Sequence, residues 1–402
     1  MTATERFLKY VAYHTTSDYD SETSPSSERQ KYLANALAEE MKALGLKNVH
    51  MDGCANVIGT LPANTDKSAP VLGLIAHMDT SPDASGENAK PRIVNYQGGE
   101  LALSDAVSLN EALCPGLEGY IGQDIIVTDG STLLGADDKA GIAEIMTALE
   151  KMIADDIPHS EIRAVFTTDE EVGRGTDGLD VNELGCDFAY TVDGGPIGEI
   201  EYENFNAANA VVSIQGVGVH PGKAKGIMIN AATVAMEFNA LLPPDEVCEK
   251  TEGYEGFFHL HTIMGSATET DLHYLIRDHD MASFERRKAM MQEAAEEINR
   301  RYGPGTAKAV IQDSYFNMRE KILPHMHLIS RAEEAFRKNG IAPMILPIRG
   351  GTDGARLSWD GLPCPNLSTG GYNFHGVREW IPVSSIERMV NVILDIAASF
   401  AE

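Results

Sequence analysis

The chain has 402 residues, of which 43% are hydrophobic and 23% charged, and this composition is typical of a folded protein long enough for two domains. Its 60 acidic side chains outnumber the 32 basic ones, and the formal charge of -28 would repel phosphate backbones and anionic lipid surfaces. We therefore expect neither nucleic acid nor a membrane as a partner, and no run of residues reaches the ~18 apolar positions of a membrane span.

The first two hundred residues alternate helical patterns with short apolar runs. This alternation predicts an α/β fold, with a mostly parallel sheet and helices on both of its faces. Ser26 and Ser27 are predicted to cap a helix that ends at Gly45. The other elements expected here are strands over residues 71–76, 162–166 and 188–192, and a helix over residues 140–152.

The pattern changes after residue 206. The elements expected there are a strand at 210–215, a helix at 230–242, strands at 257–264 and 272–278, a helix at 283–302 and a strand at 307–311. This βαββαβ order is that of a ferredoxin-like α+β domain. The α/β pattern then returns, with helices over 327–339 and 385–400 and strands near Ile345 and Asn366. We therefore expect one α/β domain built from residues 1–206 and 316–402, interrupted by an α+β insert over residues 207–315.

Residues that can bind metal adjoin two of these expected elements. His77 directly follows the strand 71–76, and Asp79 is placed to orient its ring. A histidine in a structural hydrogen bond is the alternative, and His-x-Asp alone does not decide between them. Asp137 and Asp138 stand at the start of the helix 140–152, where capping by acidic residues is the alternative.

The same theme recurs at three further places. Glu170 and Glu171 follow the strand 162–166, Asp193 ends the strand 188–192, and His375 lies in a glycine-rich segment near the C-terminus. In open α/β sheets functional groups gather beyond the carboxyl ends of the strands. The residues expected at one edge of the sheet are His77, Asp137, Glu171, Asp193 and His375. Two histidines and three carboxylates suit two zinc-like ions that share one carboxylate, which leaves Glu170 as a base.

Several segments carry a family resemblance: LIAHMDTSPD, TLLGADDKAGIAEIMTAL, TDEEVGRG, YTVDGG, ENFNAA, HPGKAKG, TEGYEGF, DSYFNMREK, PIRGGTDGARLS and GLPCPNLSTGGYNFHG. They resemble those of the peptidase T family of tripeptide aminopeptidases. That family is part of a di-zinc superfamily of aminopeptidases, carboxypeptidases and deacylases. The similarity extends from about Glu5 to the last expected helix.

The resemblance implies two Zn²⁺ per chain, one held by His77, Asp137 and Asp193 and the other by Asp137, Glu171 and His375. It also implies that Asp79 orients His77. Glu170 would take a proton from the water that bridges the metals and pass it to the leaving amine. All of these positions are occupied as the family requires.

In the family the insert forms a lid, and the resemblance implies that His220 reaches the substrate. Asn230, Arg277 and Arg349 are further candidates for substrate contact, because a guanidinium can bind a peptide carboxylate through two parallel hydrogen bonds. The alternatives are a His220 that satisfies backbone groups of its own turn, and arginines that form salt bridges on an acidic protein.

Two His-x-His patterns resemble metal pairs, at His259 with His261 and at His325 with His327. Neither has a third ligand nearby in the sequence, so we interpret both as structural. The five cysteines are odd in number, widely spaced and never arranged as Cys-x-x-Cys, which argues against disulfides and against a thiolate metal site. This usage, together with an N-terminal segment that lacks the apolar core of a signal peptide, predicts a cytoplasmic location.

We therefore expect a homodimeric di-zinc aminopeptidase that hydrolyses the N-terminal peptide bond of tripeptides and releases the N-terminal amino acid. A dipeptidase or an N-acyl amino acid hydrolase of the same superfamily would share the metal residues and is the alternative among enzymes. A non-catalytic protein that keeps the metal site is the alternative from another class. The presence of Glu170 and of every ligand position argues against it.

Overall fold

The computed structural model describes residues 1–65 and 67–401, and the chain divides into two compact units. The first unit comprises Met1–Tyr202, Glu320–Leu346 and Thr352–Glu402, and the second comprises Glu203–Arg319 and Pro347–Gly351. The second unit is therefore inserted into the chain of the first. Within the described residues, none of the helices has the length and apolar character needed to cross a membrane.

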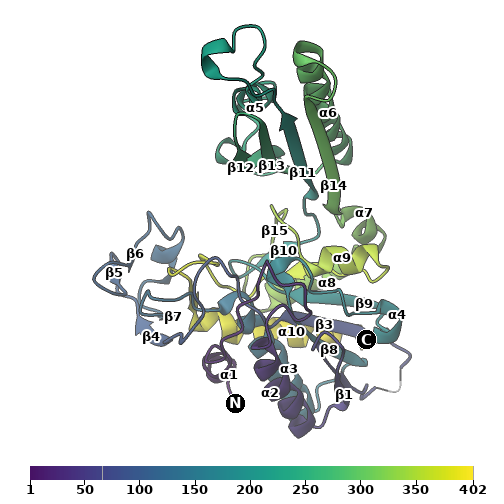
Figure 1. The fold of residues 1–402 in the computed structure, drawn as a ribbon. Helices are drawn as coiled ribbons and strands as arrows, with labels where there is room; N and C mark the ends of the chain where they lie inside the picture. The colour runs from purple at the N-terminus through teal and green to yellow at the C-terminus, as the bar shows by residue number, and fades with distance from the viewer. Residues whose placement is uncertain (66, 402) are drawn as a thin grey trace. The chain divides into compact units, whose positions relative to one another are not determined.

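The first unit is built on an eight-stranded sheet with the order β1-β2-β8-β3-β9-β16-β10-β15 (Figure 1). Its strands are β1 (Lys47–Met51), β2 (Val57–Leu61), β3 (Leu72–His77), β8 (Ile162–Thr167), β9 (Phe188–Val192), β10 (Glu199–Glu201), β15 (Met344–Ile345) and β16 (Asn366–Leu367). The four central strands, from β8 to β16, are mutually parallel, whereas β1 and β2 pair antiparallel at one edge. Every residue of β3 is buried, as expected for a parallel strand covered on both faces.

Helices cover both faces of this sheet. They are α1 (Ala3–Tyr10), α2 (Gln30–Leu44), α3 (Ala136–Ala154), α4 (Val181–Leu184), α7 (Arg319–Ile322), α8 (His327–Lys338), α9 (Asp353–Trp359) and α10 (Val383–Phe400). Helix α3 packs on β3 and β9, and helices α1 and α10 pack against α3. On the opposite face, Leu357 of α9 shares a buried cluster with Ile75 and Val165. The predicted α/β fold with helices on both faces is confirmed.

The beginning of α2 differs from the prediction. The helix begins at Gln30, and Arg29 precedes it without a capping side chain, so the expected caps from Ser26 and Ser27 are wrong. Both serines turn to other partners, since Ser26 donates to Asp169 and Ser27 to the backbone. The predicted end is confirmed, because Gly45 adopts the left-handed conformation with a φ of 94° that favours glycine.

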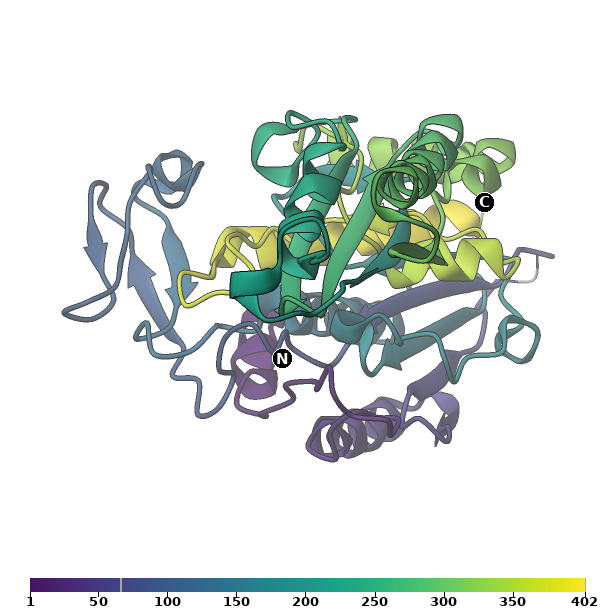
Figure 2. The ribbon, with the colours of Figure 1, turned by 45° about the horizontal axis from the view of Figure 1, so that its top comes forward.

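Two small antiparallel sheets, which were not expected, lie at the end of the first unit away from β1 (Figures 1 and 2). One has the order β17-β7-β4 and the other pairs β5 with β6. Their strands are β4 (Arg92–Asn95), β5 (Leu101–Ala102), β6 (Ser108–Leu109), β7 (Asp124–Val127) and β17 (Trp380–Pro382). Trp380 of β17 is buried there and stacks on Tyr372 with ring centroids 4.3 Å apart. The pairing of β17 with β7 brings the C-terminal segment beside the loop that leads into α3.

The second unit has the predicted βαββαβ order. Its elements are β11 (Asn206–Gln215), α5 (Ala231–Ala240), β12 (Phe257–Gly265), β13 (Glu269–Asp278), α6 (Met281–Tyr302) and β14 (Ala307–Tyr315). The strands form an antiparallel sheet in the order β12-β13-β11-β14, which is the ferredoxin-like arrangement. Both helices pack on one face of the sheet, where alternate residues of β13 join Phe238 and Ile298 in the core (Figure 2).

Candidate metal centre

His77 lies at the carboxyl end of β3 and is almost completely buried. Its Nδ1 is 3.1 Å from the carbonyl oxygen of Asp79 and 3.4 Å from Oδ1 of the same residue. Its Nε2 is 2.8 Å from Oδ1 of Asp137 and 3.7 Å from Oδ1 of Asp193. A histidine held through one ring nitrogen presents the other in a defined direction. Nε2 is therefore the nitrogen available to a metal, and it faces two carboxylates.

The carboxylate of Asp137 lies between two imidazoles. Its Oδ1 contacts His77, and its Oδ2 is 3.2 Å from Nε2 of His375. The same Nε2 is 2.9 Å from Oε2 of Glu171, while Nδ1 of His375 is 3.6 Å from the carboxylate of Asp83. Asp137 therefore has one oxygen on each side of the cluster, as a carboxylate shared by two ions requires.

Three carboxyl groups of this cluster resist ionisation, whereas Asp137 does not: burial disfavours its charge, but hydrogen bonds from His375 and His77 hold its pKa below the usual range. Burial raises the pKa of Glu170 well above its usual range, and the Asp193 carboxylate raises it further. Burial and the charge of Asp137 raise the pKa of Glu171 to about 8. Burial also raises the pKa of Asp193. Each upward shift reflects negative charges gathered where water is scarce.

The two histidines shift in the opposite direction. Hydrogen bonds to Asp137 and Glu171 raise the pKa of His375 to about 11. Burial disfavours the charged form of His77, but Asp193 and Asp137 hold its pKa well above the usual value. Protons thus compensate the negative charge of this cluster. Divalent ions in the same place would stabilise ionised carboxylates and neutral imidazoles instead.

The donor set fits metal ions. Oε1 of Glu171 is buried and has no hydrogen-bond partner among the described residues, although a buried carboxylate oxygen ordinarily has one. Ligand atoms of His77, Asp137 and Glu171 lie within 4.8 Å of one another, and so do those of His77, Glu170 and Asp193. Imidazole nitrogens with carboxylate oxygens are the ligands of zinc and of other first-row metals.

Asp79 holds the turn that carries the two glutamates. Its carboxylate is fully buried and accepts hydrogen bonds from the backbone N–H of Glu170 at 3.0 Å and of Glu171 at 3.2 Å. The same side chain faces Nδ1 of His77. One carboxylate thus positions residues from two strand ends.

Asp169 does not face this cluster, although it adjoins Glu170 in the sequence. Its carboxylate is fully buried and accepts hydrogen bonds from Ser26, Gln30 and Arg174. Its φ of 62° lies in the left-handed region, which is uncommon for a residue other than glycine. These bonds tie the turn to the start of α2 and the segment before it, and the carboxylate of Asp169 is therefore not solvated surface charge.

Glu379 is a buried residue that the sequence analysis missed. Its carboxylate accepts hydrogen bonds from the backbone N–H of Leu134 at 2.7 Å, Gly135 at 2.8 Å and Asp137 at 3.1 Å. Burial raises its pKa to about 7. The sequence offers no indication of this role beyond the four-residue distance to His375, because its partners lie more than two hundred residues earlier.

Two further buried aspartates, Asp138 and Asp353, accept hydrogen bonds from residues in or next to the cluster. Asp138 accepts hydrogen bonds from the backbone N–H of His77 at 3.1 Å and of Gly141 at 3.3 Å. Asp353, at the start of α9, accepts one from Oγ1 of Thr167 at 2.9 Å, and burial raises its pKa to about 7. Asp138 is next to the predicted ligand Asp137 in the sequence, whereas no sequence pattern indicated a role for Asp353.

The substrate-contact candidates all lie in the second unit. His220 is exposed, and its Nδ1 accepts a hydrogen bond from the backbone N–H of Gly222 at 3.1 Å. Asn230 caps α5 by accepting from Ala232 at 3.1 Å. The contact of His220 is of the kind that its alternative interpretation predicts, and contact of either residue with substrate stays a prediction.

The two arginines differ in how fully they are engaged. Nη1 of Arg277 donates to the carbonyl oxygens of Ala208 and Ile276. Arg349 donates through both Nη1 and Nη2 to a single loop, at Thr251, Gly253 and Glu255. Among the hydrogen bonds of the described residues, those of Arg277 therefore leave more of its guanidinium available.

The α/β sheet, the insert and the cluster of acids and histidines at the strand ends are those of a metal-dependent hydrolase. Residues 202–306 match the model of a peptidase dimerisation domain. The fold is shared with a dinuclear metal binding peptidase of Bacillus subtilis (TM-score 0.66, 13% identity, covering 99% of this chain and 98% of that one). It is also shared with the aminopeptidase PepT of Bacillus cereus (TM-score 0.80, 24% identity, covering 100% and 98%). The chain is 51% identical over 402 residues to peptidase T of Caldanaerobacter subterraneus, covering 99% of this chain and 98% of its relative. It belongs to the peptidase T family, and the resemblance stated from its motifs is confirmed.

Proposed function

We propose that this protein is a di-zinc aminopeptidase that removes the N-terminal residue from tripeptides. One observation carries the metal part of the proposal: the Asp137 carboxylate presents one oxygen beside His77 and the other beside His375. The peptide part rests on relatives named peptidase T, which are about half identical to this chain over nearly its full length.

One metal would be held by His77, Asp137 and Asp193, and the other by Asp137, Glu171 and His375. When bound, zinc polarises the scissile carbonyl and lowers the pKa of a coordinated water toward ~7. Asp79 keeps Nε2 of His77 directed at its ligand position and holds the backbone of Glu170 and Glu171.

Glu170 is the proposed proton carrier. It accepts a proton from the attacking water, and then donates that proton to the amine nitrogen that leaves when the peptide bond breaks. Burial raises the pKa of Glu170, which makes its carboxylate a stronger base for the first transfer. Its neighbour Glu171 contacts His375 and is proposed as a metal ligand, not as the proton carrier.

The insert over residues 207–315 is the proposed lid, and Arg277 is the first choice for the group that binds the peptide carboxylate. Arg349 is the second, because both of its terminal nitrogens already bind the loop at residues 251–255. His220 and Asn230 are proposed to approach the peptide from the same unit.

A panel of substrates tests the activity. With added zinc, we expect release of the free N-terminal amino acid from tripeptides, and much slower release from dipeptides and tetrapeptides. Cleavage of N-acyl amino acids without turnover of tripeptides would identify a deacylase instead. Absence of any hydrolysis by metal-loaded protein would indicate a binding protein.

We infer a homodimer, because residues 202–306 match a peptidase dimerisation domain. Light scattering coupled to gel filtration should give a mass of about twice the 43.5 kDa of one chain. A cytoplasmic location is proposed from the five free thiols, which suit a reducing compartment.

A further inference from the structure

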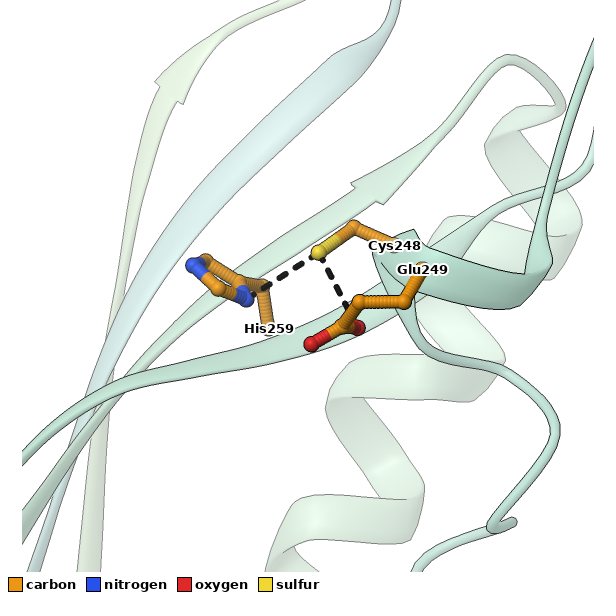
Figure 3. Close-up of side chains that lie close together, drawn as sticks. All are labelled: Cys248, Glu249 and His259. Carbon is orange, nitrogen blue, oxygen red and sulfur yellow. Dashed lines mark hydrogen bonds between the residues drawn. The ribbon is translucent and has the colours of Figure 1, made fainter.

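The second unit contains another group of metal-ligating side chains, formed by Cys248, Glu249 and His259 (Figure 3). Cys248 and Glu249 lie on the short helical turn η4 (Cys248–Lys250), and His259 lies on β12, an edge strand of the sheet. The Sγ atom of Cys248 is 3.2 Å from Nδ1 of His259 and 3.2 Å from Oε2 of Glu249. One ligand atom from each residue lies within 4.8 Å of the other two.

We propose that Cys248, Glu249 and His259 bind a divalent ion of the zinc type, at a site that shares no residue with the cluster around His77. The sequence pattern indicated a structural His259 and no thiolate metal site, because Cys248 and His259, 11 residues apart, follow no recognised ligand spacing. Thiolate, imidazole and carboxylate are all zinc ligands. Three protein ligands leave one position of a tetrahedral ion for water.

The distances suit such an ion. Bonds of ~2.3 Å to sulfur and ~2.05 Å to nitrogen at a tetrahedral angle place these two ligand atoms about 3.6 Å apart. The 3.2 Å between Sγ of Cys248 and Nδ1 of His259 therefore needs to open by only about 0.4 Å. Glu249 and His259 also line a hollow of about 340 Å³, and a water molecule occupies roughly 30 Å³ of liquid. The fourth ligand therefore has room.

The Glu249 carboxylate beside the thiol supplies negative charge that favours a cation at this site. On binding, the S–H bond breaks, a sulfur–metal bond forms, and the proton passes to solvent.

The loop that carries the two ligands is held in place before any ion binds. The backbone N–H of Phe258, next to His259, donates to the carbonyl of Glu246 at 2.8 Å. Lys250 pairs with Asp245 at 2.7 Å, away from the cluster. A site organised in advance loses little conformational entropy on binding. The ion would therefore link this loop to the edge strand β12.

Cobalt provides a specific test in the full-length protein under reducing conditions. A Co²⁺–thiolate bond gives a charge-transfer absorption in the near ultraviolet, and the cluster around His77 offers only nitrogen and oxygen ligands. We expect this absorption in the unmodified protein and in Cys54→Ser, whose half-buried thiol belongs to none of the metal-ligand groups of the described residues. It should be lost in Cys248→Ser. No thiolate absorption in the unmodified protein, or full absorption in Cys248→Ser, would overturn the proposal.

Affinity and stoichiometry give a second test. His259→Gln should weaken cobalt binding at the thiolate site by about 10-fold or more. Zinc-loaded Cys248→Ser should contain one ion fewer per chain than the unmodified protein and keep its tripeptide hydrolysis. Equal zinc content in the two proteins would refute the site. If the unmodified protein showed the thiolate absorption but did not hydrolyse tripeptides, that result would instead count against the proposed function.

Discussion

Replacing Gly141 by alanine tests whether the close approach of α3 to β9 positions the metal ligands. A β-carbon at this position would lie 2.0 Å from the carbonyl oxygen of Val192 and 2.6 Å from Oδ1 of Asp138. Non-bonded heavy atoms pack at about 3.5 Å, so the helix and the strand have to separate by roughly 1 Å or more. Val192 directly precedes Asp193, and Asp137 lies four residues before Gly141. The movement therefore separates two proposed ligands of one metal.

Two effects of this substitution oppose each other. Helix propensity favours alanine over glycine by ~0.8 to 1 kcal/mol. Overpacking costs ~1 to 3 kcal/mol or more, and the closest atom here belongs to the backbone and cannot rotate away. We expect the overpacking cost to exceed the gain in helix propensity, with a fall of about 1 kcal/mol or more in the free energy of unfolding. Because a misplacement of about 1 Å can cost ~100-fold in rate, we expect kcat/KM to fall by roughly 10- to 100-fold.

Urea unfolding and tripeptide hydrolysis, both with saturating zinc, measure these two changes. Gly53→Ala is the matched control, because none of the described residues has an atom within 4 Å of a β-carbon built at Gly53. The control should keep both the stability and the activity. If Gly141→Ala were instead more stable by about 1 kcal/mol and fully active, propensity alone would explain it and the packing argument would be refuted.

The other predictions concern the proposed chemistry. Glu170→Gln should lower kcat by about 100-fold or more while metal content is kept, because it removes the proton acceptor. Glu171→Gln should instead lose metal on dialysis, and equal metal loss in the two variants would contradict their separate roles. Chelation should abolish activity, and active protein with a single metal per chain would rule out a shared Asp137. Arg277→Ala should lower kcat/KM for tripeptides by roughly 10- to 100-fold, from the ~1.5 to 3 kcal/mol of a charge-assisted hydrogen bond. A tripeptide amide should be a poor substrate for the unmodified enzyme and should lose little more in the variant; equal cleavage of amide and acid would exclude carboxylate recognition.

The sequence determined the central strands of the large sheet, the elements of the insert and the edge of the sheet at which the chemistry gathers. Apolar periodicity is local, so the strands that end at His77 and Val192 and the βαββαβ insert could be predicted from short windows. Parallel strands end at a common edge, which is why five separate motifs could be assigned to one cluster. The structure brings these predicted ligands together around Asp137.

Tertiary structure alone decided which polar groups meet across long sequence separations. Ser26 is of a residue type that often caps helices, yet its hydroxyl donates to Asp169, which lies 143 residues away. Glu379 satisfies the backbone N–H groups before Asp137 only because β17 pairs with β7. Cys248 and His259 share no recognised spacing and meet only because a turn lies against an edge strand. A buried polar group takes whichever partner the packed chain brings within reach, and that choice is not contained in local periodicity.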